Sequence, residues 1–154
     1  MHIYRYITAL VVLGLLLAAP IEAAPTAGDA ADAKVITDAT GGNYRATKGK
    51  YFDKDCNEWL EYEAEVVDLN GDGQPEVFIS VQGSCLGGLA GFYMELYIKD
   101  NKGRWKQQFG FPGIYNVFKT KNRGYPDIEI GGPGFCFPVW RWNGRQYAIH
   151  KKCP

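Results

Sequence analysis

The densest group of residues that could do chemistry is the segment Asp68-Leu69-Asn70-Gly71-Asp72-Gly73-Gln74-Pro75-Glu76. Side chains that carry oxygen stand at its first, third, fifth and ninth positions, and a glycine stands at the sixth. This spacing lets a tight loop wrap a hard cation, because alternate side chains turn inward and the seventh residue offers its backbone carbonyl. The sequence therefore predicts a calcium-binding loop.

An EF-hand would need a bidentate glutamate at the twelfth position of this loop, and Ile79 stands there. The residues after the loop, Val77-Phe78-Ile79, favour a strand over a helix. The alternative to ion binding is a polar turn whose aspartate and asparagine side chains cap their own backbone. We prefer the ion, since three carboxylates this close would repel one another if left bare. Such an ion would be structural and would stabilise a hairpin.

An Asp-x-Asx-x-Asp-Gly-x-x-acid loop that runs directly into a strand resembles the calcium loop of FG-GAP and VCBS-type β repeats. The resemblance covers residues 64–83 of this chain. It implies that a structural Ca²⁺ is held by Asp68, Asn70, Asp72, Gln74 and Glu76.

Part of the motif recurs 51 residues further on, where residues 124–130 share the pattern Gly-x-Pro-acid-branched-x-Ile with residues 73–79. A period near 50 residues suits blade-like β units, although two units are too few to close a propeller. A chance match over so short a window is the alternative. The second copy has Lys119, Lys121 and Arg123 where the first has its upstream ligands, so it cannot hold calcium. This basic run is either a solvated turn or a lip that recognises a carboxylate-bearing partner.

The C-terminal part is the most distinctive. Residues 131–144 read Gly-Gly-Pro-Gly-Phe-Cys-Phe-Pro-Val-Trp-Arg-Trp-Asn-Gly, after Tyr125-Pro126-Asp127-Ile128. Together they are similar to a recurrent ending of small exported bacterial proteins that also carry the acidic loop. The resemblance then extends over most of residues 60–153 and implies a fold and a compartment. Trp140 and Trp142 fall on one strand face, where they either pack in the core or form an exposed aromatic binding face.

The N-terminus reads as a secretory signal peptide. One cation, Arg5, precedes an apolar run over residues 7–19, and a region of small residues follows over 20–25. We predict cleavage after Ala23 and a periplasmic or secreted location. All four cysteines lie beyond this point, and an even count in an exported chain favours disulfides. Of three possible connectivities we prefer Cys56–Cys85 and Cys136–Cys153, because each joins neighbours in the sequence.

Apolar residues alternate with polar ones over residues 60–66 and 92–99, as in strands with one wet face. Residues 60–66 could also form a helix, because Glu, Leu and Ala are good helix formers. Further strands are predicted over 76–81, 104–109, 139–142 and 145–149, the last two joined by the hairpin signal Asn143-Gly144. The predicted fold is mainly β: one small antiparallel domain of hairpins, made of two FG-GAP/VCBS-like units and stapled by disulfides. We place this domain at residues 43–154, after a signal peptide over 1–23 and a flexible lead-in over 24–42.

Composition argues against several classes of function. The 17 Lys and Arg residues balance 17 Asp and Glu residues, so nothing draws the whole chain to nucleic acid or anionic lipid. One of the two histidines, His2, lies in the signal peptide, which leaves only His150 and little support for an enzyme. No membrane span is expected after cleavage.

The sequence therefore predicts a non-catalytic exported module that binds a protein or cell-wall partner, with Lys119, Lys121, Arg123, Trp140 and Trp142 as its partner-binding residues. A specific form is a periplasmic inhibitor or immunity protein of a cell-wall hydrolase, with residues 83–91 as the protruding loop. The alternative is a carboxylate-based glycoside hydrolase. Its acids would come from Glu61, Glu63, Glu95, Asp127 and Glu129.

Overall fold

The structure is a computed structural model that describes residues 27–132 and 136–153. The predicted signal peptide and its cleavage site lie outside these residues. Within them, no helix has both the length and the apolar character needed to cross a membrane.

The described strands form two antiparallel sheets, so the predicted mainly β, antiparallel class is confirmed. Sheet A has five strands in chain order: β1 (Lys48–Asp53), β2 (Glu58–Val67), β3 (Glu76–Gln82), β4 (Phe92–Lys99) and β5 (Trp105–Pro112). Sheet B has four, also in chain order: β6 (Ile114–Asn122), β7 (Tyr125–Gly131), β8 (Val139–Trp142) and β9 (Tyr147–Lys151). The helical elements are α1 (Ala27–Ala39), the short α2 (Ser84–Gly87) and a 3₁₀ turn, η1 (Gly88–Ala90).

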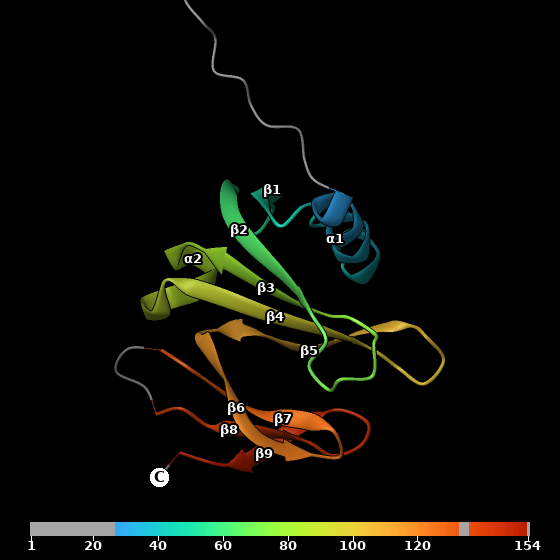
Figure 1. Ribbon diagram of the computed structural model, residues 1–154. Helices are drawn as coiled ribbons and strands as arrows, with labels where there is room; N and C mark the ends of the chain where they lie inside the picture. Colours follow the sequence, from blue (N-terminus) through green and yellow to red (C-terminus); the bar gives the residue numbers. More distant parts are fainter. Residues whose placement is uncertain (1–26, 133–135, 154) are drawn as a thin grey trace, which may run out of the picture.

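Helix α1 covers one face of sheet A, and sheet B packs against the other face (Figure 1). Strand β3 shows why both faces are covered. Val77 and Ile79 pack in the cluster that contains Ile36 of α1, whereas Phe78 packs in the cluster that contains Ile128 of sheet B. Because successive residues of a strand point to opposite faces, a continuous apolar run such as β3 has to be buried on both sides.

The predicted flexible lead-in is wrong for residues 27–42. Helix α1 occupies most of that stretch, and its Ile36 and Ala39 are buried in the core. The turn after the helix is also fixed, since the buried Thr40 hydroxyl donates to the Ile36 carbonyl at 2.8 Å. Alanine favours a helix, and packing against sheet A stabilises it although its apolar stripe is narrow. The remaining residues of the lead-in, 24–26, lie outside the described residues.

Both predicted disulfides are confirmed, with Cα–Cα distances of 5.9 Å for Cys56–Cys85 and 5.4 Å for Cys136–Cys153. Residues 60–66 lie in strand β2, so the helical alternative is wrong. The last strand begins at Tyr147, later than predicted, because Asn143 closes a longer turn. The amide of Asn143 donates to the carbonyl of Gln146 at 3.0 Å.

Antiparallel neighbours place alternate connections at the same end of a sheet. The β2–β3, β4–β5, β6–β7 and β8–β9 connections therefore share one end of the molecule, which we call the turn end (Figure 1). Segment α2 lies at the opposite end, the disulfide end, where Cys56 and Cys85 are joined.

Candidate functional site

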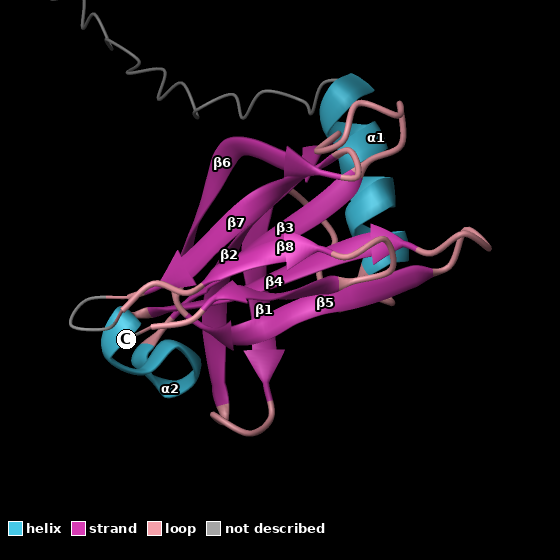
Figure 2. Ribbon diagram, turned by 90° about the horizontal axis from the view of Figure 1, so that it is seen from below, coloured by secondary structure: helices cyan, strands magenta, loops and turns pink. Residues whose placement is uncertain are grey.

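A groove of about 800 Å³ lies where β5, the edge strand of sheet A, faces β8 and β9 of sheet B. Viewed from below, β5 and β8 run beside each other (Figure 2). The lining combines aromatic rings, amides and cations: Trp140, Trp142, Tyr147, Asn101, Gln107, Gln108, Gln146, Lys99, Lys106 and Arg145, with Asp100 and Gly144. These residues come from the ends of strands and from the β4–β5 and β8–β9 turns, so the stacking of the two sheets creates the groove.

The two tryptophans form a supported wall of the groove. Each is half-buried and packs against the core: the Trp140 ring centroid lies 5.1 Å from that of Phe109, and the Trp142 centroid lies 4.5 Å from that of Tyr125. The Asn122 side chain donates to the backbone carbonyl of Trp142 at 2.7 Å and holds the end of β8 in place. The tryptophan pair therefore both packs on the core and lines a hollow.

The indole N–H of Trp140 is buried and has no hydrogen-bond partner among the described residues. Such an unpaired donor costs free energy in the free protein. We find no structural role for it within the described part of the chain.

Positive charge dominates the groove. Lys106 and Arg145 are exposed, and no ion pair joins either of them to another residue in the described part of the chain. The Lys99 ammonium lies 4.8 Å from the centre of the Trp105 ring, at a cation–π distance. Three cations therefore line the groove, and none of them has an ion pair in the described part of the chain.

Asp100 is the one carboxylate among the described lining residues, and it is already neutralised. The backbone N–H of Arg104, followed by its guanidinium at 2.8 Å, lowers the pKa of Asp100 to about 2. The carboxylate therefore stays ionised but offers the groove no free negative charge.

The structure brings part of the predicted partner-binding set together. Arg123 lines a smaller hollow of about 390 Å³ that shares Gly144, Arg145 and Gln146 with the groove. Lys119 and Lys121 are exposed on strand β6 and line neither hollow. Arg123, Trp140 and Trp142 thus share one region, and the basic run divides.

Sequence reasoning missed the cations and glutamines of the groove. Lys106, Gln107 and Gln108 follow the first residue of strand β5, and Arg145 and Gln146 lie in the β8–β9 turn. No local pattern marks these residues, because only the packing of sheet B on sheet A brings the two segments together. The hairpin signal at residues 143–144 was the one available pointer to this end of the molecule.

The acidic loop at the turn end has the geometry of a self-capped turn. The Asp68 carboxylate accepts hydrogen bonds from the amides of Gly71, Asp72 and Gly73, and these bonds, Gly73 first, lower its pKa. The Asn70 side chain donates to the Asp72 carboxylate at 2.9 Å. Gly73, with φ of 81°, makes the bend that its position in the motif predicts. Asp68, Asn70 and Asp72 are thus gathered in one loop and are the hard oxygen donors that calcium prefers.

Glu76 differs from the other predicted ligands because it is buried and hydrogen-bonded to the core. It is only 2% exposed, and it accepts from the Leu69 amide at 2.7 Å and from the Tyr125 hydroxyl at 2.8 Å. Burial raises the pKa of Glu76, against the opposing effect of these two hydrogen bonds. Because both carboxylate oxygens are engaged, Glu76 ties the loop to sheet B and fits a calcium shell less well than Asp68 or Asp72.

Among the His, Cys, Asp and Glu side chains of the described residues, only those of Cys56, Glu58 and Cys85 bring three potential ligand atoms within 4.8 Å of one another. The two sulfurs form a disulfide and so cannot act as thiolate ligands. The three carboxylates of the acidic loop do not all lie this close to one another.

The acids considered for glycoside hydrolysis are spread over the molecule. Glu61 and Glu63 pair with lysines of β1 across the edge of sheet A. Glu95 accepts from tyrosines under α1, and Asp127 and Glu129 alternate with the inward-facing residues of β7. None of these five residues lines the groove.

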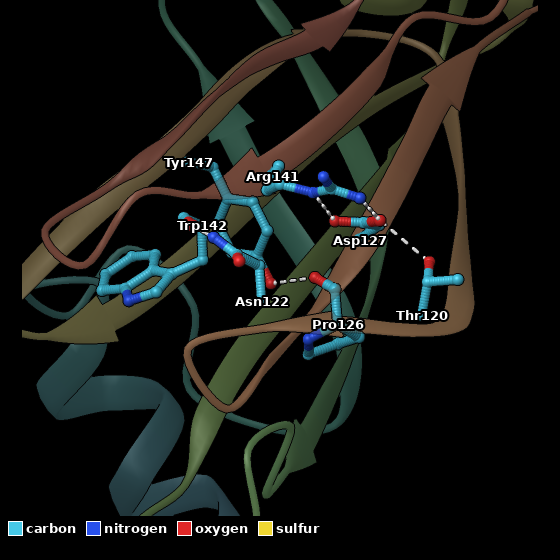
Figure 3. A network of polar contacts seen from close by, with 7 residues as sticks. All are labelled: Thr120, Asn122, Pro126, Asp127, Arg141, Trp142 and Tyr147. Atoms are coloured by element: carbon cyan, nitrogen blue, oxygen red, sulfur yellow. Dashed lines mark hydrogen bonds and ion pairs between the residues drawn. The ribbon is translucent and has the colours of Figure 1, made fainter.

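Asp127 takes part in a compact polar network on sheet B (Figure 3). The Arg141 guanidinium binds both of its oxygens, at 2.8 and 2.7 Å, and the Thr120 hydroxyl donates at 2.8 Å. These contacts, that of Arg141 first, lower the pKa of Asp127. The network is a structural clamp across three strands.

Residues 83–91, the predicted inhibitory loop, form α2 and η1 at the disulfide end. The Cys56–Cys85 bond anchors this segment to the β1–β2 turn, and Leu89 on it is 85% exposed. Gly87 is required for the close approach of the chain, since a Cβ there would lie 2.3 Å from the backbone nitrogen of Phe92.

Comparisons of the chain with protein-family models, with curated proteins and with solved structures gave no match. The resemblance to FG-GAP and VCBS-type repeats therefore stays a prediction from the motif.

Proposed function

We propose that this protein is a non-catalytic, exported β module that binds a macromolecular partner in the groove between β5, β8 and β9. The observation that supports this most is the combination of two supported tryptophans with the unpaired cations Lys106 and Arg145 around one hollow. Aromatic and arginine side chains are the residue types that contribute most to binding at interfaces. An exposed cation that forms no ion pair in the described part of the chain is available to an anionic partner.

The two disulfides are compatible with an oxidising, exported location. We propose that the location is periplasmic or extracellular, as the predicted signal peptide implies. The partner would then be a component of the cell envelope or of the medium.

The experiment is retention of soluble cell-envelope material on the immobilised protein. We expect the Lys106→Gln/Arg145→Gln variant to retain at least about tenfold less than the wild type, since charge-assisted contacts are worth about 1.5–3 kcal/mol each. Both side chains are exposed, so the fold should be unaffected. Lys54→Gln, an exposed cation in the β1–β2 turn at the disulfide end, is the matched control and should behave as the wild type. Equal retention by the double variant would refute the proposal.

One observation favours a second candidate, an inhibitor of a cell-wall hydrolase. Leu89 is presented on a short segment that a disulfide fixes in place, as a plug for an enzyme cleft would require. Leu89→Asp would then abolish inhibition of the hydrolase and leave binding in the groove intact.

We also propose that Asp68, Asn70, Asp72 and the backbone carbonyl of Gln74 hold a structural Ca²⁺. The support is the donor set and the fixed loop geometry. Glu76 would contribute by anchoring the loop to sheet B.

A further inference from the structure

The residues that line the groove indicate which class of molecule binds there. This inference rests on the proposed function. Among its described lining residues, none is aliphatic: every one is aromatic, an amide, charged or glycine. Protein partners bury an apolar core of interface whose anchors fill pockets of the other surface. Tryptophan, tyrosine and arginine also serve as anchors at protein interfaces, so the choice between a protein and a sugar depends on the amides and on the spacing of the rings.

A sugar chain matches this lining better. A sugar ring has flat C–H faces, which pack on an indole, and a rim of hydroxyl groups that both donate and accept hydrogen bonds. Trp140 and Trp142 occupy positions i and i+2 of β8, so their side chains are about 7 Å apart on one face and offer neighbouring platforms to consecutive rings. The rim of the groove has Gln107, Gln108 and Gln146, whose amides both donate and accept.

Hydrogen bonds within the chain also hold the amide of Gln108 in place. The Gln108 Oε1 atom accepts from the Tyr147 amide at 3.3 Å, across the junction of the two sheets. The acceptor of this side chain is therefore used by the protein, and its Nε2 atom donates to the Lys106 carbonyl at 3.4 Å, which leaves the second N–H as a donor. A fixed donor beside an aromatic face is suited to a ring hydroxyl.

The positive charge of the groove indicates that the bound sugar carries anionic groups. Lys106 and Arg145 need anionic partners, and a guanidinium binds a carboxylate through two parallel hydrogen bonds. A single-stranded nucleic acid would also meet rings and cations. The chain as a whole carries no net charge, however, and so lacks the long-range attraction that phosphate backbones exploit.

We infer that the groove binds a carboxylate-bearing glycan, with sugar rings on Trp140 and Trp142 and carboxylates at Lys106 and Arg145. Binding should weaken as salt is added, because the contacts with these exposed cations are screened.

The test is titration calorimetry of the purified full chain with defined probes. The carboxylated glycans are oligomers of galacturonate, alginate and hyaluronate; the comparison probes are carboxyl-reduced galacturonate oligomers, poly-glutamate and oligo(dT). We expect at least one carboxylated glycan to bind about tenfold or more tightly than any comparison probe. Equal affinity for the reduced oligomer, poly-glutamate or oligo(dT), or no binding of any carboxylated glycan, would overturn the inference.

Matched variants locate the site. Trp142→Ala should lower the glycan affinity about tenfold or more, and Trp59→Ala, which removes a tryptophan that is 67% exposed on β2, should not. If Trp142→Ala does not fold, the exposed Gln107→Ala and Lys106→Gln exchanges give the same comparison. Retention of envelope material that depends on Lys106 and Arg145, without binding of any glycan, would leave the proposed function standing and reject this inference. If neither the retention that depends on Lys106 and Arg145 nor the binding of a glycan is observed, the proposed function and this inference are both rejected.

Discussion

Glu76 and Asp127 occupy the same position in the two motif copies, and their surroundings differ. Glu76 lies between the sheets with two neutral donors, so burial raises its pKa. Asp127 meets the Arg141 guanidinium, which lowers its pKa. One sequence pattern thus provides two structural anchors with opposite pH behaviour.

The pKa of Glu76 is higher in the folded protein than in the unfolded chain, so the folded state holds the proton more strongly. Its contribution to stability therefore falls as the pH rises from below its ordinary pKa through the raised one. We expect Glu76→Gln to remove this part of the pH dependence in urea unfolding. The cost at low pH should stay below about 1 kcal/mol, because a Tyr125 hydroxyl can also accept from an amide.

Glu76→Ala is the contrast, since it leaves the Leu69 amide and the Tyr125 hydroxyl buried without a partner. It should lower the free energy of unfolding by about 2–4 kcal/mol at every pH. Glu95 is present in both variants and in the wild type, so its own titration cancels from the comparison. An unchanged pH slope in Glu76→Gln would contradict this account.

The motif predicted the positions of Glu76 and Asp127 in the two copies but not the contacts that these side chains make. Tyr125, the partner of Glu76, is 49 residues away, and Arg141 is 14 residues from Asp127. Local spacing carries no information on such partners. The same spacing did identify Asp68, Asn70 and Asp72 as one loop, because their geometry is local.

The acidic loop between β2 and β3 is the element whose ion content is most readily measured. If it holds Ca²⁺, the ion at about 100 times its dissociation constant should raise the melting temperature of the EDTA-treated, disulfide-intact protein by about 5–10 °C. Asp72→Asn should lose this shift, because it removes one charged ligand from the loop.

Asp55→Asn, which removes an exposed acid from the β1–β2 turn, is the control and should respond to calcium as the wild type does. A wild-type melting temperature that calcium leaves unchanged would assign the loop to the alternative, a self-capped polar turn.

Helix α1 shows where elements cannot be predicted from pattern alone. The strands of sheet A were predictable because their apolar residues alternate with polar ones or run continuously. The buried stripe of α1 consists mainly of Val35, Ile36 and Ala39 within an Ala- and Asp-rich stretch. Such a short helix is stabilised by the surface it covers, which the sequence around it does not reveal.

On the scale of the whole molecule, the strands that hold the two motif copies turn equivalent faces in the same direction. Val77 and Ile79 of sheet A face α1, and their counterparts Ile128 and Ile130 in sheet B face sheet A. Each sheet therefore turns the equivalent face in the same direction, as units of a repeat array do. The order of the stack is α1, sheet A and sheet B (Figure 1).

This stacking leaves two outer faces, one on sheet A and one on sheet B. A terminal unit of an array has to be capped or to have a polar outer face. Helix α1 covers the face of sheet A that points away from sheet B. At the other end the outer face of sheet B has the Asp127–Arg141 clamp, with charged groups where a third unit would need apolar ones (Figure 3).

The groove is also a product of this stacking, and that is why only part of it could be predicted. Trp140, Trp142 and Arg123 lie close in the sequence and were identified as a set. Lys106 belongs to the other sheet, and it joins them only because β5 lies along the edge of β8 and β9.

The central claim, that partners bind in this groove, is tested most directly by hydrogen-exchange mass spectrometry with and without the envelope material that the protein retains. Our account predicts protection concentrated in residues 99–108 and 140–147, and no change in β1 and β2. Protection confined to residues 83–91 at the disulfide end, or none at the turn end, would contradict it.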